Sequence, residues 1–171
     1  MFEMAMLVRI AKIMMVAFLA LLMLLISVNN ILDYGTNFEF VKHVLSMDTI
    51  SNDTKVSWRS VSSGALQHIA YVLIITWESL SAITCAAGAV KCYRARQKPA
   101  VEFDKSKNLA LCGLVMSVSL WLVGFLTVGG EWFVMWHSTA WNGQTAAMRM
   151  LEITLLFLIF LIQPDGDVVD E

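Results

Sequence analysis

Residues 13–32, IMMVAFLALLMLLISVNNIL, form a run of 20 residues without a charged side chain. Residues 108–130 form a second run, of 23 residues, and between residues 60 and 90 the only formal charge is Glu78. A helix of about 20 predominantly apolar residues is long enough to cross the roughly 30 Å hydrocarbon core of a bilayer. The three runs therefore predict three membrane-spanning helices.

A fourth membrane helix is predicted near the C-terminus. The apolar run 153–162 is too short by itself, but it becomes long enough if its helix begins near Trp141 and includes Arg149 and Glu152. The chain is 58% hydrophobic and 15% charged, whereas soluble domains carry about 25% charged residues. The alternation typical of the strands of membrane barrels is missing. We therefore expect an all-α membrane protein, a four-transmembrane-helix bundle with a structured outer cap.

The expected organisation is a single membrane domain over residues 1–171. Its membrane helices are expected over 8–30, 64–92, 107–128 and 144–163. Between them we expect an outer segment over 31–63, a cytoplasmic loop over 93–106 and a tryptophan-rich outer segment over 129–143. A cytoplasmic tail is expected over 164–171.

Basic residues lie mainly on one predicted side of the membrane. They precede the first uncharged run and lie between the apolar parts of the second and third helices: Arg9, Lys12, Lys91, Arg94, Arg96, Lys98, Lys105 and Lys107. The segment 33–59 has three basic residues against four acidic ones, and residues 129–144 have no lysine or arginine. The positive-inside rule then places both termini in the cytoplasm, as in a bacterial inner membrane. The net charge of −2 suggests no nucleic-acid partner.

Two local patterns predict where one short helix begins and how two long helices pack. Thr36 and Glu39 fit a capping box, and apolar residues at helical spacing follow, which predicts a short amphipathic helix over 37–46. The inner half of the second membrane helix is rich in small residues around Gly88, and the third helix offers Gly113. Because small residues allow membrane helices to approach closely, we expect these two helices to pack tightly.

Ionisable side chains within the predicted helices form a candidate intramembrane site. Counted from the cytoplasmic ends at about 1.5 Å per residue, Glu78, Arg149 and Glu152 lie at similar depth. His68 and Tyr71 share the helical stripe of Glu78. A charge at membrane depth is costly and usually pairs inside the bundle, so we expect Glu78 to pair with Arg149 and Glu152 to brace that arginine. The cluster is either an internal ionic clamp or a proton or ligand site.

The segment 129–144, GGEWFVMWHSTAWNGQ, holds three of the six tryptophans. Aromatic residues collect at membrane interfaces, but here they alternate with polar side chains between Gly-Gly and Asn-Gly turn signals. We expect a structured cap packed on residues 37–59, with the rings of Trp132 and Trp136 facing the cap rather than lipid. The candidate outer binding surface consists of Trp58, Arg59, Glu131, Trp132, Trp136, His137, Trp141 and Asn142.

No cofactor, metal site or catalytic site is predicted. Haem ligation by two histidines needs two facing intramembrane histidines, but only His68 lies near the bundle interior, with His43 and His137 in outer segments. The three histidines lack the spacing of zinc ligands. The chain has no glycine-rich phosphate loop, and no serine or cysteine has a sequence context that identifies a nucleophile. We therefore expect a protein without enzyme activity.

Four segments stand out along the chain: NFEFVKHVLSMDT (37–49), WR (58–59), HIAYVLIITWE (68–78) and GGEWFVMWHSTAWNG (129–143). Together they resemble a bacterial family of predicted small integral membrane proteins classed as a domain of unknown function. The resemblance covers about residues 29–160. It implies a four-helix inner-membrane protein and supplies no reaction, substrate or active-site residue.

Two classes of function fit these features. The first is a membrane protein that binds a membrane or periplasmic protein through its outer cap, as an accessory subunit of an envelope complex or as an immunity protein against a membrane-active toxin. The second is a small transporter or proton-coupled carrier that uses Glu78, Arg149 and Glu152 and works as a homo-oligomer. A quinone-interacting subunit is a weaker third alternative. In each case the lipid bilayer is the immediate environment, and we favour the first class.

Overall fold

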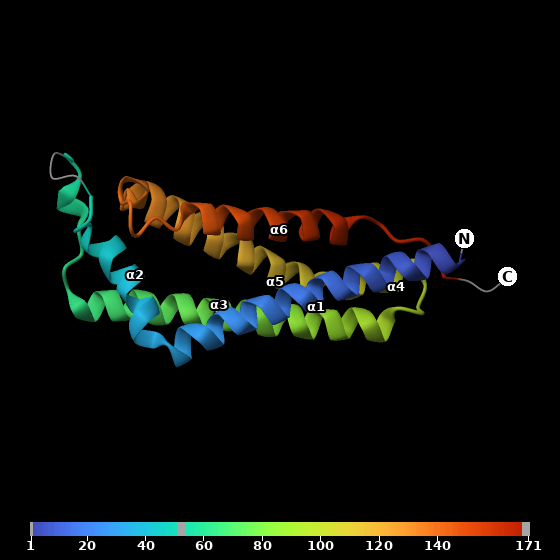
Figure 1. The fold of residues 1–171 in the computed structure, drawn as a ribbon. Coiled ribbons are helices and arrows are strands. Elements are labelled where there is room, and N and C mark those ends of the chain that lie inside the picture. The colour runs from blue at the N-terminus through green and yellow to red at the C-terminus, as the bar shows by residue number, and fades with distance from the viewer. Residues whose placement is uncertain (1, 51–53, 169–171) are drawn as a thin grey trace.

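The computed structural model describes residues 2–50 and 54–168 (Figure 1). Residues 51–53 of the predicted outer segment and residues 169–171 of the predicted tail lie outside the described residues. The helices, in chain order, are α1 (Phe2–Leu32), α2 (Tyr34–Ser46), η1 (Ser57–Arg59), α3 (Gly64–Ala95), α4 (Ala100–Ser106), α5 (Asn108–Ser119), η2 (Leu120–Trp132), η3 (Met135–His137) and α6 (Gln144–Ile162). The short elements η1 and η3 are 3-10 helices, and η2 is a π-helix.

Four stretches are long and apolar enough to cross a membrane: Met4–Leu32, Gly64–Ala95, Ala100–Trp132 and Gln144–Ile162. The described residues contain no strand, so the predicted all-α fold with four membrane helices is confirmed. Figure 1 shows an elongated bundle with both termini at one end and α2 at the other. The terminal end comprises the start of α1 with residues 96–107 and 163–168, and the cap end comprises residues 33–50, 54–63 and 133–143.

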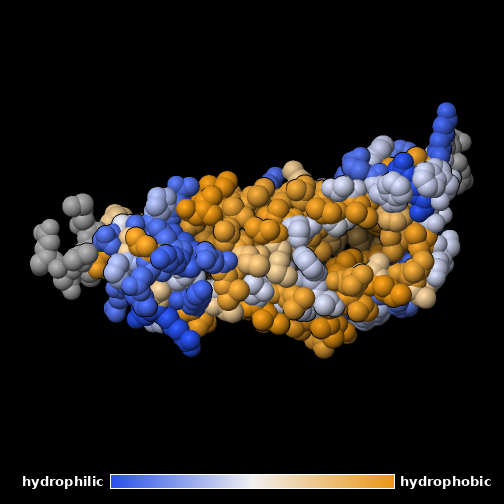
Figure 2. Space-filling model, turned by 180° about the vertical axis from the view of Figure 1, so that it is seen from behind, coloured by the Kyte–Doolittle hydropathy of each residue, from blue (hydrophilic) through white to orange (hydrophobic). Residues whose placement is uncertain are grey.

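The surface of the bundle matches a bilayer. Its middle is covered by large exposed apolar side chains, among them Leu21, Leu73 and Leu156. Figure 2 shows this apolar band between two more polar ends. Hydrocarbon contact is the environment in which such a surface is stable.

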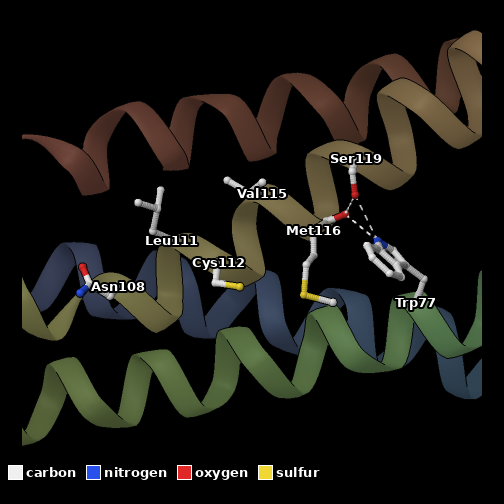
Figure 3. Close-up of a pocket in the computed structure, with 7 residues that line it drawn as sticks. All are labelled: Trp77, Asn108, Leu111, Cys112, Val115, Met116 and Ser119. Atoms are coloured by element: carbon white, nitrogen blue, oxygen red, sulfur yellow. Dashed lines mark hydrogen bonds between the residues drawn. The ribbon is translucent and has the colours of Figure 1, made fainter.

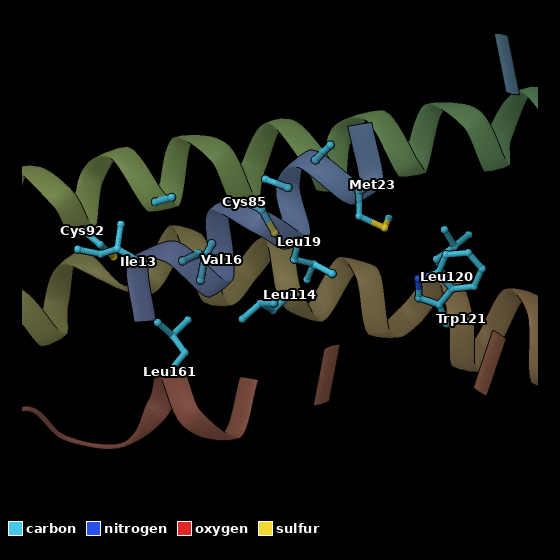
Figure 4. Packing of buried hydrophobic residues seen from close by; sticks show 14 of the residues in the cluster. Ile13, Val16, Leu19, Met23, Cys85, Cys92, Leu114, Leu120, Trp121 and Leu161 are labelled. Atoms are coloured by element: carbon cyan, nitrogen blue, oxygen red, sulfur yellow. The ribbon is translucent and has the colours of Figure 1, made fainter. Parts of the chain in front are cut away.

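The core of the bundle is an apolar layer (Figure 4). Val16, Leu19 and Met23 from α1 pack against Cys85 from α3 and Leu114 from α5, and each of these side chains is at most 1% exposed. Such side chains interdigitate at close packing. The hydroxyl groups of Ser117 and Thr154 are buried beside Met23, so the layer is apolar mainly at Val16, Leu19, Cys85 and Leu114.

Small residues bring α3 and α5 into close contact, as predicted. A Cβ atom added to Gly88 would lie 2.8 Å from Cβ of Ala110, and one added to Gly113 would lie 2.5 Å from Sγ of Cys85. Real Cβ atoms do not approach so closely, so these two glycines are needed for the observed helix separation.

The predicted capping box is wrong. It does not form, because α2 begins at Tyr34, so that Thr36 and Glu39 already lie inside the helix. Glu39 instead accepts hydrogen bonds of 3.0 and 2.9 Å from Lys42, which lower the pKa of this carboxyl. The segment 93–106, expected to be a cytoplasmic loop, contains the helix α4.

The predicted turn at Gly129-Gly130 is wrong as well, since both glycines lie within η2. The helix that begins as α5 continues past Ser119 to Trp132. Beyond Ser119 its α turns are replaced by wider π turns, in which residue i bonds to residue i+5. The indole of Trp77 on α3 lies at this change, where its Nε1 donates to the Met116 carbonyl at 3.0 Å and to Ser119 Oγ at 3.2 Å (Figure 3). The same figure shows an apolar surface groove along the seam between α3 and α5.

Candidate functional site

The cap end has an apolar core of its own. Val44 and Met47 from α2 and the loop after it are buried against Phe133 and Met135 from the segment after η2. The ring of Trp141 stacks on His43 at 4.6 Å between centroids. The predicted packing of the tryptophan-rich segment on α2 is therefore present, and the cap is an ordered body rather than a loose loop.

Three side chains form an exposed cluster on this cap, here named the Trp–Arg cluster: Trp58, Arg59 and Trp132. The two indole rings meet edge to face, with 6.0 Å between centroids and 81° between planes. Cζ of Arg59 lies 4.5 Å from the centroid of the Trp132 ring, and its Nη1 donates a 3.2 Å hydrogen bond to the Trp132 carbonyl. The guanidinium thus contacts both aromatic rings, since its Cζ also lies 5.5 Å from the centroid of the Trp58 ring. Trp58 nevertheless remains 71% exposed and Trp132 48% exposed.

The other predicted surface residues do not join this cluster. Trp136 is 47% exposed, and its ring contacts only the ring of its neighbour His137, at 4.4 Å, among the aromatic contacts of the described residues. Glu131 and Asn142 are exposed on the cap. Trp132 and Trp136 do not lie on one helix, because Val134 adopts a left-handed conformation with φ of 46° and the helix ends between them.

The predicted ion pair of Glu78 with Arg149 does not form. Glu78 is 1% exposed and accepts a 2.8 Å hydrogen bond from Nδ2 of Asn30 on α1. Arg149 and Glu152 both lie on the exposed side of α6, where Nε of Arg149 makes a long contact of 3.4 Å to the carbonyl of Thr145. The sequence predicts that the three ionisable residues lie at similar depth in the membrane. However, α3 packs on α1 and α5, whereas α6 packs on α5, η2 and α1. The pair therefore fails because the two helices are not neighbours.

The stripe of polar residues on α3 faces α1 instead. Tyr71 is buried and its hydroxyl donates a 3.0 Å hydrogen bond to the Asn30 carbonyl. His68 hydrogen-bonds through Nδ1 to the Tyr34 hydroxyl at 2.8 Å and stacks on Phe38 at 4.0 Å. This polar track begins at the cap end, includes the buried carboxyl group of Glu78 and continues to the 2.6 Å hydrogen bond between the hydroxyls of Ser27 and Ser79. The sequence analysis did not select Asn30 or Tyr34 as partners of this stripe. The amide side chain of Asn30, close to the end of a membrane helix, could have indicated a hydrogen-bond partner inside the bundle.

The terminal end holds a buried ionic network that the sequence did not reveal. The carboxylate of Asp165 is 1% exposed and forms ion pairs with Lys12, at 2.8 Å, and with Lys107. Both ammonium groups also donate to the Gln163 carbonyl, at 2.6 and 2.9 Å. The guanidinium of Arg9 is fully buried and donates to the carbonyls of residues 96, 98 and 166. The segment 163–167 is thereby fastened across the terminal end of the bundle.

No group of three or more possible metal ligands is found within residues 2–50 and 54–168. The ordered cap, the apolar band and the four membrane helices together define a small multi-pass integral membrane protein. The chain belongs to the family described as predicted small integral membrane proteins (DUF2165), whose family model matches residues 8–164. Comparisons with curated proteins and with solved structures find no match.

Proposed function

We propose that this protein binds another membrane or periplasmic protein through the Trp–Arg cluster and catalyses no reaction. The observation that carries the proposal is the 71% exposure of Trp58, whose ring is held beside Trp132 and Arg59. Tryptophan and arginine are enriched among the residues that dominate binding energy at protein interfaces. A ring that is already fixed loses little conformational entropy when a partner covers it.

The side of the membrane follows from the charge distribution as part of this proposal. The basic residues near the terminal end favour a cytoplasmic location for it, which puts the cap outside a bacterial inner membrane. On that side the partner is a periplasmic domain or the outer part of another membrane protein. Two kinds of partner fit: a subunit of an envelope complex, and a membrane-active toxin that the protein neutralises.

The proposal is tested by affinity capture from native membranes, with bound proteins identified by mass spectrometry. Trp58→Ala and Trp132→Ala are compared with Trp136→Ala, which removes a tryptophan of nearly equal exposure outside the cluster. We expect one protein to be lost from the first two variants and retained by the third. Equal capture by all three variants, or equal loss from all three, would refute the proposal and identify the rings as membrane anchors.

A second candidate is a small proton-coupled carrier, favoured by the buried Glu78 at the end of the polar track. The buried apolar side chains of Val16, Leu19 and Leu114 lie between this carboxyl group and the terminal end, so a carrier would have to move protons past them. Proton flux into liposomes that is abolished by Glu78→Gln would support this function, and sealed liposomes with the wild-type protein would exclude it.

A further inference from the structure

Helix α6 is the least covered membrane helix of the bundle. Of the residues in its most apolar stretch, 22% are buried, against 33 to 39% in the other three membrane helices. One side of α6 packs inward through Ala147, Leu151, Thr154 and Leu161. In Figure 1 the helix runs along one edge of the bundle, so that its other side is free to meet a further helix.

The free side carries a stripe with the spacing of a helix-pairing seam. Its members are all exposed and recur at alternating intervals of four and three residues: Thr145, Arg149, Glu152, Leu156 and Ile159. Alternation of four and three keeps side chains on one seam when two helices wrap around each other with a left-handed twist. The spacing therefore matches a surface that pairs with a second helix running alongside.

Two residues of this stripe need a partner that the chain itself does not offer. Arg149 and Glu152 make no ion pair with any residue in the described part of the chain. Glu152 lies eight residues into the 19-residue helix, which places it about 12 Å along a membrane span of about 28 Å. Charged residues at such depth normally face protein rather than lipid, because hydrocarbon cannot solvate them.

We infer that the free side of α6 is the interface of a symmetric dimer, with a second copy of this chain as the partner. The stripe is self-complementary, since it carries one positive and one negative side chain about 4.5 Å apart along the axis. In two parallel copies related by a twofold axis along the membrane normal, each Arg149 lies level with the partner's Arg149 and about 4.5 Å along the axis from the partner's Glu152, so the four charges form one network in which each arginine reaches the carboxylate of the other copy. The symmetry forms this pair twice, as in an isologous interface. Both charges are then neutralised within the membrane.

The interface is distinct from the Trp–Arg cluster, so the inference does not depend on the proposed function. Below the two charged residues the stripe continues with Leu156, which is 66% exposed, and Ile159, which is 53% exposed. In the dimer these side chains pack across the axis and extend the contact over the rest of the helix. The charged pair selects the partner and the register, and the apolar pair contributes packing.

The test uses charge reversal in full-length protein carrying two different affinity tags, co-expressed and extracted in lipid nanodiscs. Arg149→Glu alone gives a stripe with two negative charges, and Glu152→Arg alone gives one with two positive charges. The double variant with both reversals restores opposite charges and serves as the matched control. A mixture of the two single variants also restores them, between different chains.

We expect each single variant to lower co-capture of the second tag at least about tenfold, since two attractive pairs become repulsive. The double variant and the mixture of single variants are expected to recover wild-type co-capture. A wild-type protein without co-capture, single variants that still pair, or a loss that neither combination restores would each overturn the dimer. The first outcome would indicate a different membrane protein as the partner of α6.

A second pair of variants covers the case in which charge reversal prevents insertion. Leu156→Ala removes an exposed side chain of the stripe, and Leu21→Ala removes a similarly exposed one from α1. We expect co-capture to fall only in the α6 variant, with unchanged helical circular dichroism in both. Equal co-capture by both variants would also overturn the inference.

Discussion

The ionic network at the terminal end makes Asp165 the residue whose replacement tests the fold most directly. Its carboxylate is 1% exposed and is shared by Lys12 and Lys107, whose side chains are 1% and 8% exposed. Asp165→Asn keeps the size of the side chain but removes its charge. Lys107 retains an ion pair with Asp104, whereas Lys12 loses its only carboxylate partner among the described residues.

The expected loss of stability follows from this difference. At the observed 2.8 Å and an effective dielectric constant of about 20, the attraction between Lys12 and Asp165 is about 6 kcal/mol. In the variant, structural relaxation and water entry offset part of this lost attraction. Removing one partner of a buried ion pair therefore typically costs about 3–5 kcal/mol. Because the Gln163 carbonyl still accepts from Lys12 at 2.6 Å, we expect the low end, about 3 kcal/mol.

The assay is reversible unfolding in mixed detergent micelles, followed by circular dichroism. Asp167→Asn is the control, since Asp167 is exposed and accepts a single 2.6 Å hydrogen bond from the backbone of Ala100. It is expected to lower the free energy of unfolding by about 1 kcal/mol. Adding Lys12→Met to Asp165→Asn should recover part of the loss, because no unpaired ammonium remains. A loss for Asp165→Asn no larger than that of the control would refute the account of the network.

Three further changes test the interior of the bundle by the same unfolding assay. Gly113→Ala should destabilise by about 1–3 kcal/mol through overlap with α3, whereas Gly35→Ala, with no atom within 4 Å of the added carbon, should be neutral or stabilising. Equal effects at the two glycines would contradict the close helix contact. Asn30→Ala should cost about 1.5–3 kcal/mol because Glu78 loses its donor, and a change below about 0.5 kcal/mol would mean that the bond contributes little. Trp121→Phe removes a buried indole N–H without a partner among the described residues, so stability should be unchanged or rise by about 1 kcal/mol, and a clear loss would reveal a hidden acceptor.

The sequence predicted the candidate surface on the cap only in outline. Trp58, Arg59 and Trp132 could be selected as exposed aromatic and basic residues near the membrane boundary. Their contact could not be predicted, because it joins positions 73 residues apart through a backbone carbonyl and a ring face. Trp136 illustrates the same limit, since the left-handed backbone at Val134 ends the helix between Trp132 and Trp136.

By itself, the sequence determined the number of membrane helices, their approximate ends and the close approach of α3 and α5. These properties depend on uncharged runs and on residue size, both of which are read along the chain. The tertiary structure alone decided which charged groups meet. Depth in the membrane follows from position along a helix, but partnership depends on how each helix is rotated and which helix lies beside it. For this reason Glu78 faces Asn30 rather than Arg149, and Asp165 meets Lys12 across 153 positions of the chain.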